Sequence, residues 1–171
     1  MDNITLIGMP GCGKSTIGVI LAKVLGYRFV DIDLLIQQRE KKLLHEIIKE
    51  HGVEKFLEIE EDVGKSVIGE QMVIATGGSI VFGKQAMEHF RKISTIVYIH
   101  LPLEELEKRL GNIRRRGVVF KEGQTLADIY RERTPLYESY AQITVKAAGM
   151  DTEELMDAIV EKLNHTGNGG I

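Results

Sequence analysis

A glycine-rich stretch near the N-terminus has the residue types and the spacing of a phosphate-binding loop. It reads Gly8-Met9-Pro10-Gly11-Cys12-Gly13-Lys14-Ser15, which matches G-x-x-x-x-G-K-[ST], and Thr16 follows it. An apolar, strand-like run precedes it and a helical pattern of apolar residues follows it, which is the context that the motif requires. The glycines let backbone N–H groups curl round a phosphate, and the helix N-terminus adds positive potential. The motif predicts that Lys14 reaches the β- and γ-phosphates of a nucleotide, that Ser15 binds Mg²⁺ and that Thr16 lies near the α-phosphate.

Two carboxylates, Asp31 and Asp33, follow the next strand-like segment. Two residues apart on a locally extended chain, they point to the same side. One can hold the water shell of Mg²⁺, and the other can orient or deprotonate an acceptor hydroxyl, as phosphoryl transfer requires. A helix follows, so an acid that caps this helix is the alternative interpretation. The phosphate-binding loop beside them favours the functional interpretation.

Three further segments can contribute to a phosphoryl-transfer site. Gly77 and Gly78 follow a buried strand and permit close approach of the backbone to a ligand. The run Arg114–Arg116 is either a solvated loop or part of a lid that closes over the phosphates. Arg133 is either an anion clamp or a surface charge, and the pattern alone does not choose between them.

The elements that must position these residues alternate between strand and helix. We expect strands at 3–7, 27–30, 72–75, 95–101 and 143–145, with helices at 14–25, 34–68 with a break at Gly52, 84–92, from 103, 125–140 and from about 151. This order predicts an α/β fold of three layers, α/β/α, with a five-stranded parallel sheet. Ligands then gather at the carboxyl ends of the strands, where the three motifs meet.

Composition and length indicate one ordinary globular domain. The chain has 171 residues and a net charge of −3, which gives no bulk electrostatic attraction to nucleic acid or membrane. Cys12 is the single cysteine, so an internal disulfide is excluded. We see no signal peptide and no apolar run near the ~20 residues of a membrane span, and we expect a cytoplasmic protein.

The motifs together, in this order, resemble the shikimate kinase family, within the nucleoside-monophosphate-kinase-like group of P-loop proteins. The resemblance covers about residues 3–162. It rests on five segments: Gly8–Thr16, Asp31-Ile32-Asp33, Ala75-Thr76-Gly77-Gly78, Arg116-Gly117-Val118-Val119 and Arg133-Thr134-Pro135-Leu136-Tyr137. It implies a P-loop NTPase fold over 1–164, with acceptor-binding helices at about 34–68 and a lid at about 111–123. The residues at 165–171 themselves predict a flexible tail.

The resemblance also implies roles for individual residues. The implied ATP site consists of Gly11, Cys12, Gly13, Lys14, Ser15, Thr16, Arg109, Arg116 and Lys146. The implied acceptor site consists of Asp33, Leu57, Gly77, Gly78 and Arg133. Ser15 and Asp31 are the implied Mg²⁺ residues, and the implied catalytic residues are Lys14, Asp33 as the base and Arg116 on the lid.

The chain departs from the family pattern at three places. Leu57 stands where the family has an arginine that grips the acceptor carboxylate, and Glu60 then loses that partner. Ser79 replaces the third glycine of Gly-Gly-Gly, and Gly117-Val118-Val119 replaces Pro-Leu-Leu in the lid. A leucine cannot replace a charge-assisted clamp. Either Arg133 suffices with another cation, Lys55 or Arg39, or the acceptor is not shikimate.

The sequence therefore predicts an ATP- and Mg²⁺-dependent kinase that phosphorylates a hydroxyl of shikimate, a step toward chorismate and the aromatic amino acids. One alternative is a kinase of the same fold that acts on another small polyol or hydroxy acid, which Leu57 favours. A second is a regulatory nucleotide-binding module without turnover, although such a module needs no acceptor residues. The expected partner is a small molecule, with no nucleic acid and no membrane, and the family expectation is a monomer.

Overall fold

The strands form one parallel sheet in a computed structural model that describes residues 3–110 and 118–167. Within this part of the chain the strands are β1 (Asn3–Ile7), β2 (Arg28–Asp31), β3 (Met72–Ala75), β4 (Ser94–His100) and β5 (Ile143–Lys146). Their order in the sheet is β2-β3-β1-β4-β5, and each neighbouring pair is parallel. The predicted five-stranded parallel sheet is confirmed.

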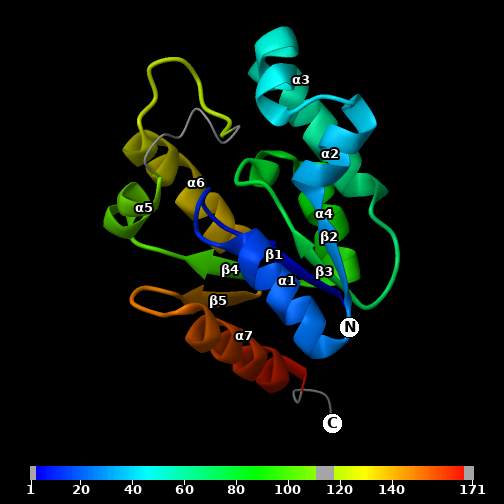
Figure 1. The fold of residues 1–171 in the computed structure, drawn as a ribbon, viewed down its shortest axis with the longest axis vertical. Helices are drawn as coiled ribbons and strands as arrows, with labels where there is room; N and C mark the ends of the chain where they lie inside the picture. Colours follow the sequence, from blue (N-terminus) through cyan, green and yellow to red (C-terminus); the bar gives the residue numbers. More distant parts are fainter. Residues whose placement is uncertain (1–2, 111–117, 168–171) are drawn as a thin grey trace.

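Helices cover both faces of this sheet (Figure 1). They are α1 (Lys14–Leu25), α2 (Ile32–Glu40), α3 (Leu44–Ser66), α4 (Lys84–Ile93), α5 (Leu103–Arg109), α6 (Leu126–Tyr140) and α7 (Thr152–Gly167), with a 3₁₀ turn η1 (Ile80–Phe82). Helices α1 and α7 contact each other on one face, while α4 and α6 pack on the other, as right-handed crossovers between parallel strands require; α3 packs against α2, α4 and η1. The predicted three-layer architecture is confirmed.

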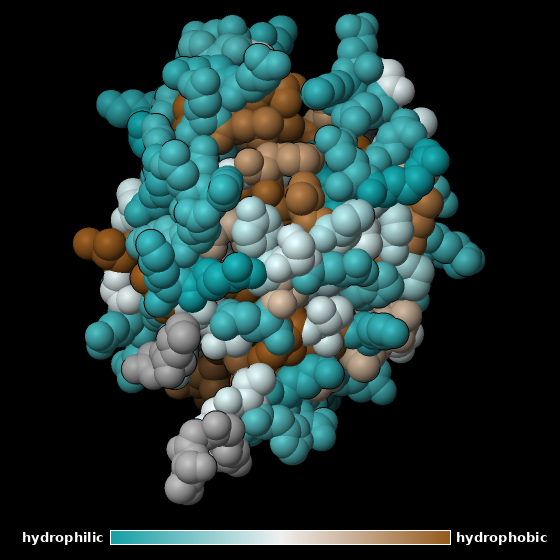
Figure 2. Space-filling model, turned by 180° about the vertical axis from the view of Figure 1, so that it is seen from behind, coloured by the Kyte–Doolittle hydropathy of each residue, from teal (hydrophilic) through white to brown (hydrophobic). Residues whose placement is uncertain are grey.

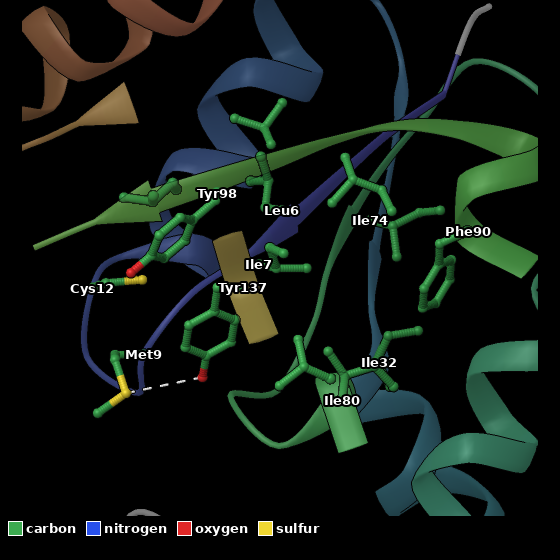
Figure 3. Packing of buried hydrophobic residues seen from close by; sticks show 14 of the residues in the cluster. Leu6, Ile7, Met9, Cys12, Ile32, Ile74, Ile80, Phe90, Tyr98 and Tyr137 are labelled. Atoms are coloured by element: carbon green, nitrogen blue, oxygen red, sulfur yellow. Dashed lines mark hydrogen bonds between the residues drawn. The ribbon is translucent and has the colours of Figure 1, made fainter. Parts of the chain in front are cut away.

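The core reaches from the sheet to the loops at its carboxyl edge. Leu6, Ile7 and Ile74 are fully buried, as expected for central parallel strands that are covered on both faces. The rings of Tyr98 on β4 and Tyr137 on α6 stack with their centroids 5.2 Å apart. Figure 3 shows the Tyr137 hydroxyl pointing to the sulfur of Met9 in the glycine-rich loop, 3.9 Å away. Packing of α6 on the sheet therefore also fixes the phosphate-binding loop.

The outer surface is mainly hydrophilic on the side opposite to the view of Figure 1, with hydrophobic atoms visible between the polar side chains (Figure 2). Among the residues that the structure describes, no helix combines the length and the apolar character needed to cross a bilayer.

The structure corrects several predicted boundaries. Helix α2 begins at Ile32, so Asp33 lies in its first turn and not on an extended chain as we expected. Gly52 does interrupt the long helix, with φ 82° and ψ 169°. The turn η1 was not predicted, and α7 continues to Gly167, into the segment expected to be a tail. Residues 168–171 and most of the predicted lid, 111–117, lie outside the described residues.

Candidate active site

The three predicted motifs meet at the carboxyl edge of the sheet. The glycine-rich loop follows β1, the aspartates lie at the end of β2 and in α2, and Gly77-Gly78 follows β3. Together they line a cavity of about 560 Å³. Its wall consists of Pro10, Gly11, Gly13, Lys14, Ser15, Thr16, Asp33, Leu44, Phe56, Glu60, Thr76, Gly77, Gly78, Ser79, Arg109, Val118, Val119 and Arg133.

The glycine-rich loop has a backbone that side chains would obstruct. Gly13 caps α1 with φ 99°, a left-handed conformation that favours glycine. At Gly8 a Cβ would lie 2.7 Å from the carbonyl oxygen of Ile99, so the loop packs directly against β4. The loop therefore places the free N–H groups of the first turn of α1 at the cavity, where they can bind an anion.

Lys14 is buried inside this loop, with 7% of its surface exposed. Its ammonium group donates hydrogen bonds to the carbonyl oxygens of Gly8, at 2.8 Å, and Met9, at 2.9 Å. Cys12 Sγ lies 3.6 Å from the same nitrogen. The positive charge is thus held at the floor of the loop, beside the place where phosphates would bind.

Ser15 and Asp31 form a pair of oxygen donors beside the loop. The Ser15 hydroxyl donates a 2.9 Å hydrogen bond to Asp31 Oδ2, while Asp31 Oδ1 accepts from the backbone N–H of Leu34. Asp31 therefore also caps α2, which confirms the capping interpretation, while its role beside Mg²⁺ stays a prediction. A hydroxyl and a carboxylate are hard oxygen ligands of the kind that Mg²⁺ prefers, and the pair fits this ion and its water shell.

Asp33 lines the cavity, and its pKa is higher than that of an ordinary aspartate. Burial, together with the negative charge of Asp31, raises its pKa to about 6, although Lys14 opposes this shift. A carboxylate with a pKa near 6 is still ionised at neutral pH, and it accepts a proton more readily than an ordinary aspartate. Asp33 is therefore suited to the role of a general base.

Glu60 on α3 faces Asp33 across Gly77. A Cβ on Gly77 would lie 2.8 Å from Glu60 Oε2 and 2.9 Å from Asp33 Oδ1, so both carboxyl groups pack into the space that the missing side chain of this glycine leaves. The Ser79 hydroxyl donates a 2.7 Å hydrogen bond to Glu60 Oε1, whereas the buried Oε2 has no partner among the described residues. Burial raises the pKa of Glu60 to about 8, so this carboxyl is mainly neutral at pH 7.

Arg133 is a buried cation in the cavity wall beside Gly78. Only 3% of it is exposed, and its guanidinium lies 5.4 Å from the ring centre of Phe82. It donates a hydrogen bond to the carbonyl oxygen of Val119, while its buried Nε lacks a partner among the described residues. Gly78 gives it room, because a Cβ there would lie 3.2 Å from an Arg133 terminal nitrogen. The surface-charge alternative for Arg133 is therefore wrong.

The cavity brings together most of the predicted site residues. Of the predicted set, those that line it are Gly11, Gly13, Lys14, Ser15, Thr16, Asp33, Gly77, Gly78, Arg109 and Arg133. Cys12 is buried under the loop, Asp31 touches Ser15, and Leu57 packs against the core; none of these three lines the cavity wall. Lys146 is exposed at the end of β5, also away from the wall. Arg116 lies outside the described residues.

Several residues of the wall were not predicted as site residues, above all Glu60 and Ser79. Glu60 had a signal in the sequence, because it stands in the apolar stripe of α3 beside Ile59 and Val63. An acid at a core position of a helix has to be neutralised or paired, and it marks a functional position. For Ser79 the only signal in the sequence was its position directly after Gly77-Gly78.

Comparisons with known proteins agree with this geometry. The family model described as "Shikimate kinase" matches residues 10–164. A shikimate kinase of Thermodesulfovibrio yellowstonii is 31% identical over 172 residues, covering 99% of this chain and 99% of the relative. The solved shikimate kinase from Acinetobacter baumannii, in complex with shikimate, has a TM-score of 0.88 and 27% identity, covering 99% of this chain and 96% of that one. The one from Aquifex aeolicus has a TM-score of 0.85 and 30% identity, covering 98% and 99%.

Proposed function

This chain belongs to the shikimate kinase family, and from that premise we propose that it transfers the γ-phosphoryl group of ATP to a hydroxyl of shikimate. The observation that carries the proposal is one cavity that is lined by a phosphate-binding loop and also by Asp33 and Arg133. A kinase needs both halves: a clamp for the nucleotide and a pocket that orients an acceptor hydroxyl.

The nucleotide half clamps the phosphates through the loop and Lys14. The ammonium of Lys14 lies 2.8 Å from the Gly8 carbonyl, and it can exchange its carbonyl partners for phosphate oxygens that carry full charges. Ser15 and Asp31 would hold Mg²⁺, which neutralises charge on the phosphates when bound. Arg109 lines the cavity from the end of α5 and is exposed, which suits a contact to the nucleotide. For Cys12, Lys146 and Arg116 a nucleotide contact stays a prediction.

In the acceptor half, Asp33 takes the proton of the attacking hydroxyl. The hydroxyl oxygen forms a bond to the γ-phosphorus, the bond from that phosphorus to the β–γ bridging oxygen breaks, and ADP leaves. The raised pKa of Asp33 supports its role as the base, because a base near neutral pKa is efficient at neutral pH. Arg133 supplies a buried positive charge, and its Nε–H, which has no partner among the described residues, can donate to the acceptor's carboxylate.

Leu57 is the residue that motivated a different acceptor, and the comparisons do not favour that alternative. Leu57 packs against the core, so on this account the carboxylate is held by Arg133 without a second arginine. The missing clamp is expected to appear as a raised KM for shikimate. The regulatory-module alternative is likewise not favoured, since the acceptor residues surround one cavity with the phosphate-binding loop.

An ADP-release assay with ATP and Mg²⁺ tests the proposal. We expect shikimate to support turnover, and gluconate and other polyols to support much less. Leu57→Arg, measured beside the parent protein, is expected to lower the KM for shikimate. A parent protein that prefers a neutral polyol over shikimate would overturn the assignment of the acceptor.

Two expectations about the whole protein stay proposals that rest on the sequence and the family. A monomer is expected, and sedimentation of the purified protein at micromolar concentration tests it. The net charge of −3 supports the expectation of no nucleic-acid or membrane partner, and fractionation of the source cells tests the expected cytoplasmic location.

A further inference from the structure

Glu60 has a feature that phosphoryl transfer by Lys14, Asp33 and Arg133 leaves unexplained. It is a carboxyl group with 2% exposure, it lies in the cavity wall, and its Oε2 has no hydrogen-bond partner among the described residues. An unpaired buried polar atom costs about 1–3 kcal/mol. Such an atom at a ligand cavity marks a group whose partner arrives with the ligand.

The surroundings of Glu60 determine which oxygen carries the proton. The Ser79 hydroxyl donates to Oε1, so Oε1 acts as an acceptor. No described cation forms an ion pair with this carboxyl: Lys14 donates to the carbonyls of its loop, and Arg133 donates to Val119. Burial raises the pKa of Glu60, and this effect outweighs the opposing hydrogen bond from Ser79 and the charges of Arg133 and Lys14. The proton therefore belongs on Oε2, the oxygen that faces Gly77.

The missing side chain of Gly77 lets the carboxyl groups of Glu60 and Asp33 come together in the cavity wall. The position of a Cβ on this glycine lies 2.8 Å from Glu60 Oε2 and 2.9 Å from Asp33 Oδ1, and the next nearest atom is 3.8 Å away. An acceptor in the cavity beside Gly77 meets both groups: a carboxylate that accepts a hydrogen bond and a carboxylic acid that donates one. Two adjacent hydroxyl groups match this pair, since one hydroxyl can donate to Asp33 while the oxygen of the other accepts from Glu60.

We propose that Glu60 is a specificity-determining residue that donates a hydrogen bond from Oε2 to the acceptor hydroxyl adjacent to the one that is phosphorylated. The acceptor class is therefore a vicinal diol, with Ser79 positioning the carboxylic acid through Oε1. The proposal rests on the proposed function and adds the requirement for the second hydroxyl. A site built to bond a hydroxyl discriminates against the analogue that lacks it, because its own polar group is then left unpaired.

The test compares two acceptors across four proteins. The acceptors are shikimate and its deoxy analogue without the hydroxyl adjacent to the phosphorylated one; the proteins are wild type, Glu60→Ala, Glu60→Gln and Glu58→Gln. Glu58 lies on the same helix and is exposed, with 67% of its side chain accessible, so it is the matched control. The measured quantity is the ratio of kcat/KM for the two acceptors, which a merely structural role of Glu60 would leave unchanged.

We expect the wild type and Glu58→Gln to prefer the diol about tenfold, as the loss of one hydrogen bond implies. In Glu60→Ala the ratio is expected to fall below about threefold, while the KM for ATP changes little. Glu60→Gln is expected to restore most of the ratio, because an amide N–H donates from the same place. A Glu60→Ala ratio equal to that of the wild type, or a Glu60→Gln ratio as low as that of Glu60→Ala, overturns the proposal.

If Glu60→Ala does not fold, the ratio of kcat/KM for the two acceptors can be measured over a pH series in the wild type and Glu60→Gln. The charged groups that face Glu60 are Asp33 from α2, Lys14 from α1 and Arg133 from α6. Above about pH 8 the wild-type carboxyl ionises and can no longer donate from Oε2, so its preference for the diol is expected to change with pH, whereas that of Glu60→Gln is expected to stay constant. Equal pH profiles for the two proteins overturn the proposal.

Failure of the proposed kinase function can be distinguished from failure of the proposal for Glu60. If the wild type binds shikimate without turnover, the kinase assignment fails, and calorimetric affinities for the same two ligands decide the role of Glu60. If the wild type binds neither ligand, both proposals fail.

Discussion

Replacing Glu60 by glutamine should change how the stability of the fold depends on pH. The pKa of Glu60 is about 8 in the folded chain and 4.5 without burial, so folding must neutralise a carboxyl that is ionised in the unfolded chain between these values. The unfolded state then binds fewer protons than the folded state, and stability decreases as pH rises. The contribution of Glu60 to the free energy of unfolding is fully present below about pH 4.5 and is lost as the pH approaches about 8.

The magnitude follows from the pKa difference. Each pH unit inside the window costs about 1.4 kcal/mol, so Glu60→Gln gains roughly 4 kcal/mol over the wild type between pH 5 and pH 8. That is a large part of the 5–15 kcal/mol of a typical domain. The substitution keeps the hydrogen bond from Ser79, because the side-chain carbonyl oxygen of glutamine can accept it.

Urea unfolding at pH 5, 6, 7 and 8 measures this difference directly. Glu58→Gln on the exposed side of the same helix is the control, and its difference from the wild type is expected to be nearly independent of pH. A constant difference between Glu60→Gln and the wild type from pH 5 to pH 8 would refute the argument that Glu60 is buried in its neutral form.

Three further substitutions probe the cavity. Lys14→Met, which keeps the apolar stem, should lower kcat about 10²–10³-fold through the loss of charge on the phosphates, measured as ADP release. Asp33→Asn should lower kcat about 10²–10⁴-fold and leave ATP affinity, measured by calorimetry, nearly unchanged; full activity would remove Asp33 as the base. Gly77→Ala places a Cβ 2.8 Å from Glu60 Oε2 and should raise the KM for shikimate at least about tenfold, with the KM for ATP as the internal control.

The sequence predicted the fold well because its signals were local. The glycine-rich motif marks the end of β1 and the beginning of α1, and the alternation of strands and helices specifies a parallel sheet with crossovers. Gly52 was correctly predicted to break the long helix, since a left-handed conformation there ends the regular pattern. The place of Asp33 inside α2 was missed because the Asp31 side chain caps that helix two residues earlier than we expected.

The site was predicted where it depends on strand ends and was missed where it depends on tertiary packing. Gly77, Asp33 and Lys14 follow strands directly, and parallel strands bring their carboxyl ends to one edge. Glu60 reaches the same cavity only because α3 packs its apolar stripe beside η1, a turn that the sequence did not predict. Its contact with Ser79 joins residues 19 positions apart, and no local pattern reports such a contact.

The transfer of the γ-phosphoryl group from ATP to shikimate is tested most directly by following a label on that group. The protein is incubated with ATP labelled at the γ-phosphate, Mg²⁺ and shikimate, and the products are separated by chromatography. We expect the label to appear on shikimate in proportion to the ADP formed, and we expect Asp33→Asn to suppress this transfer. Label that remains on ATP, or appears only as inorganic phosphate while shikimate stays unlabelled, would contradict it.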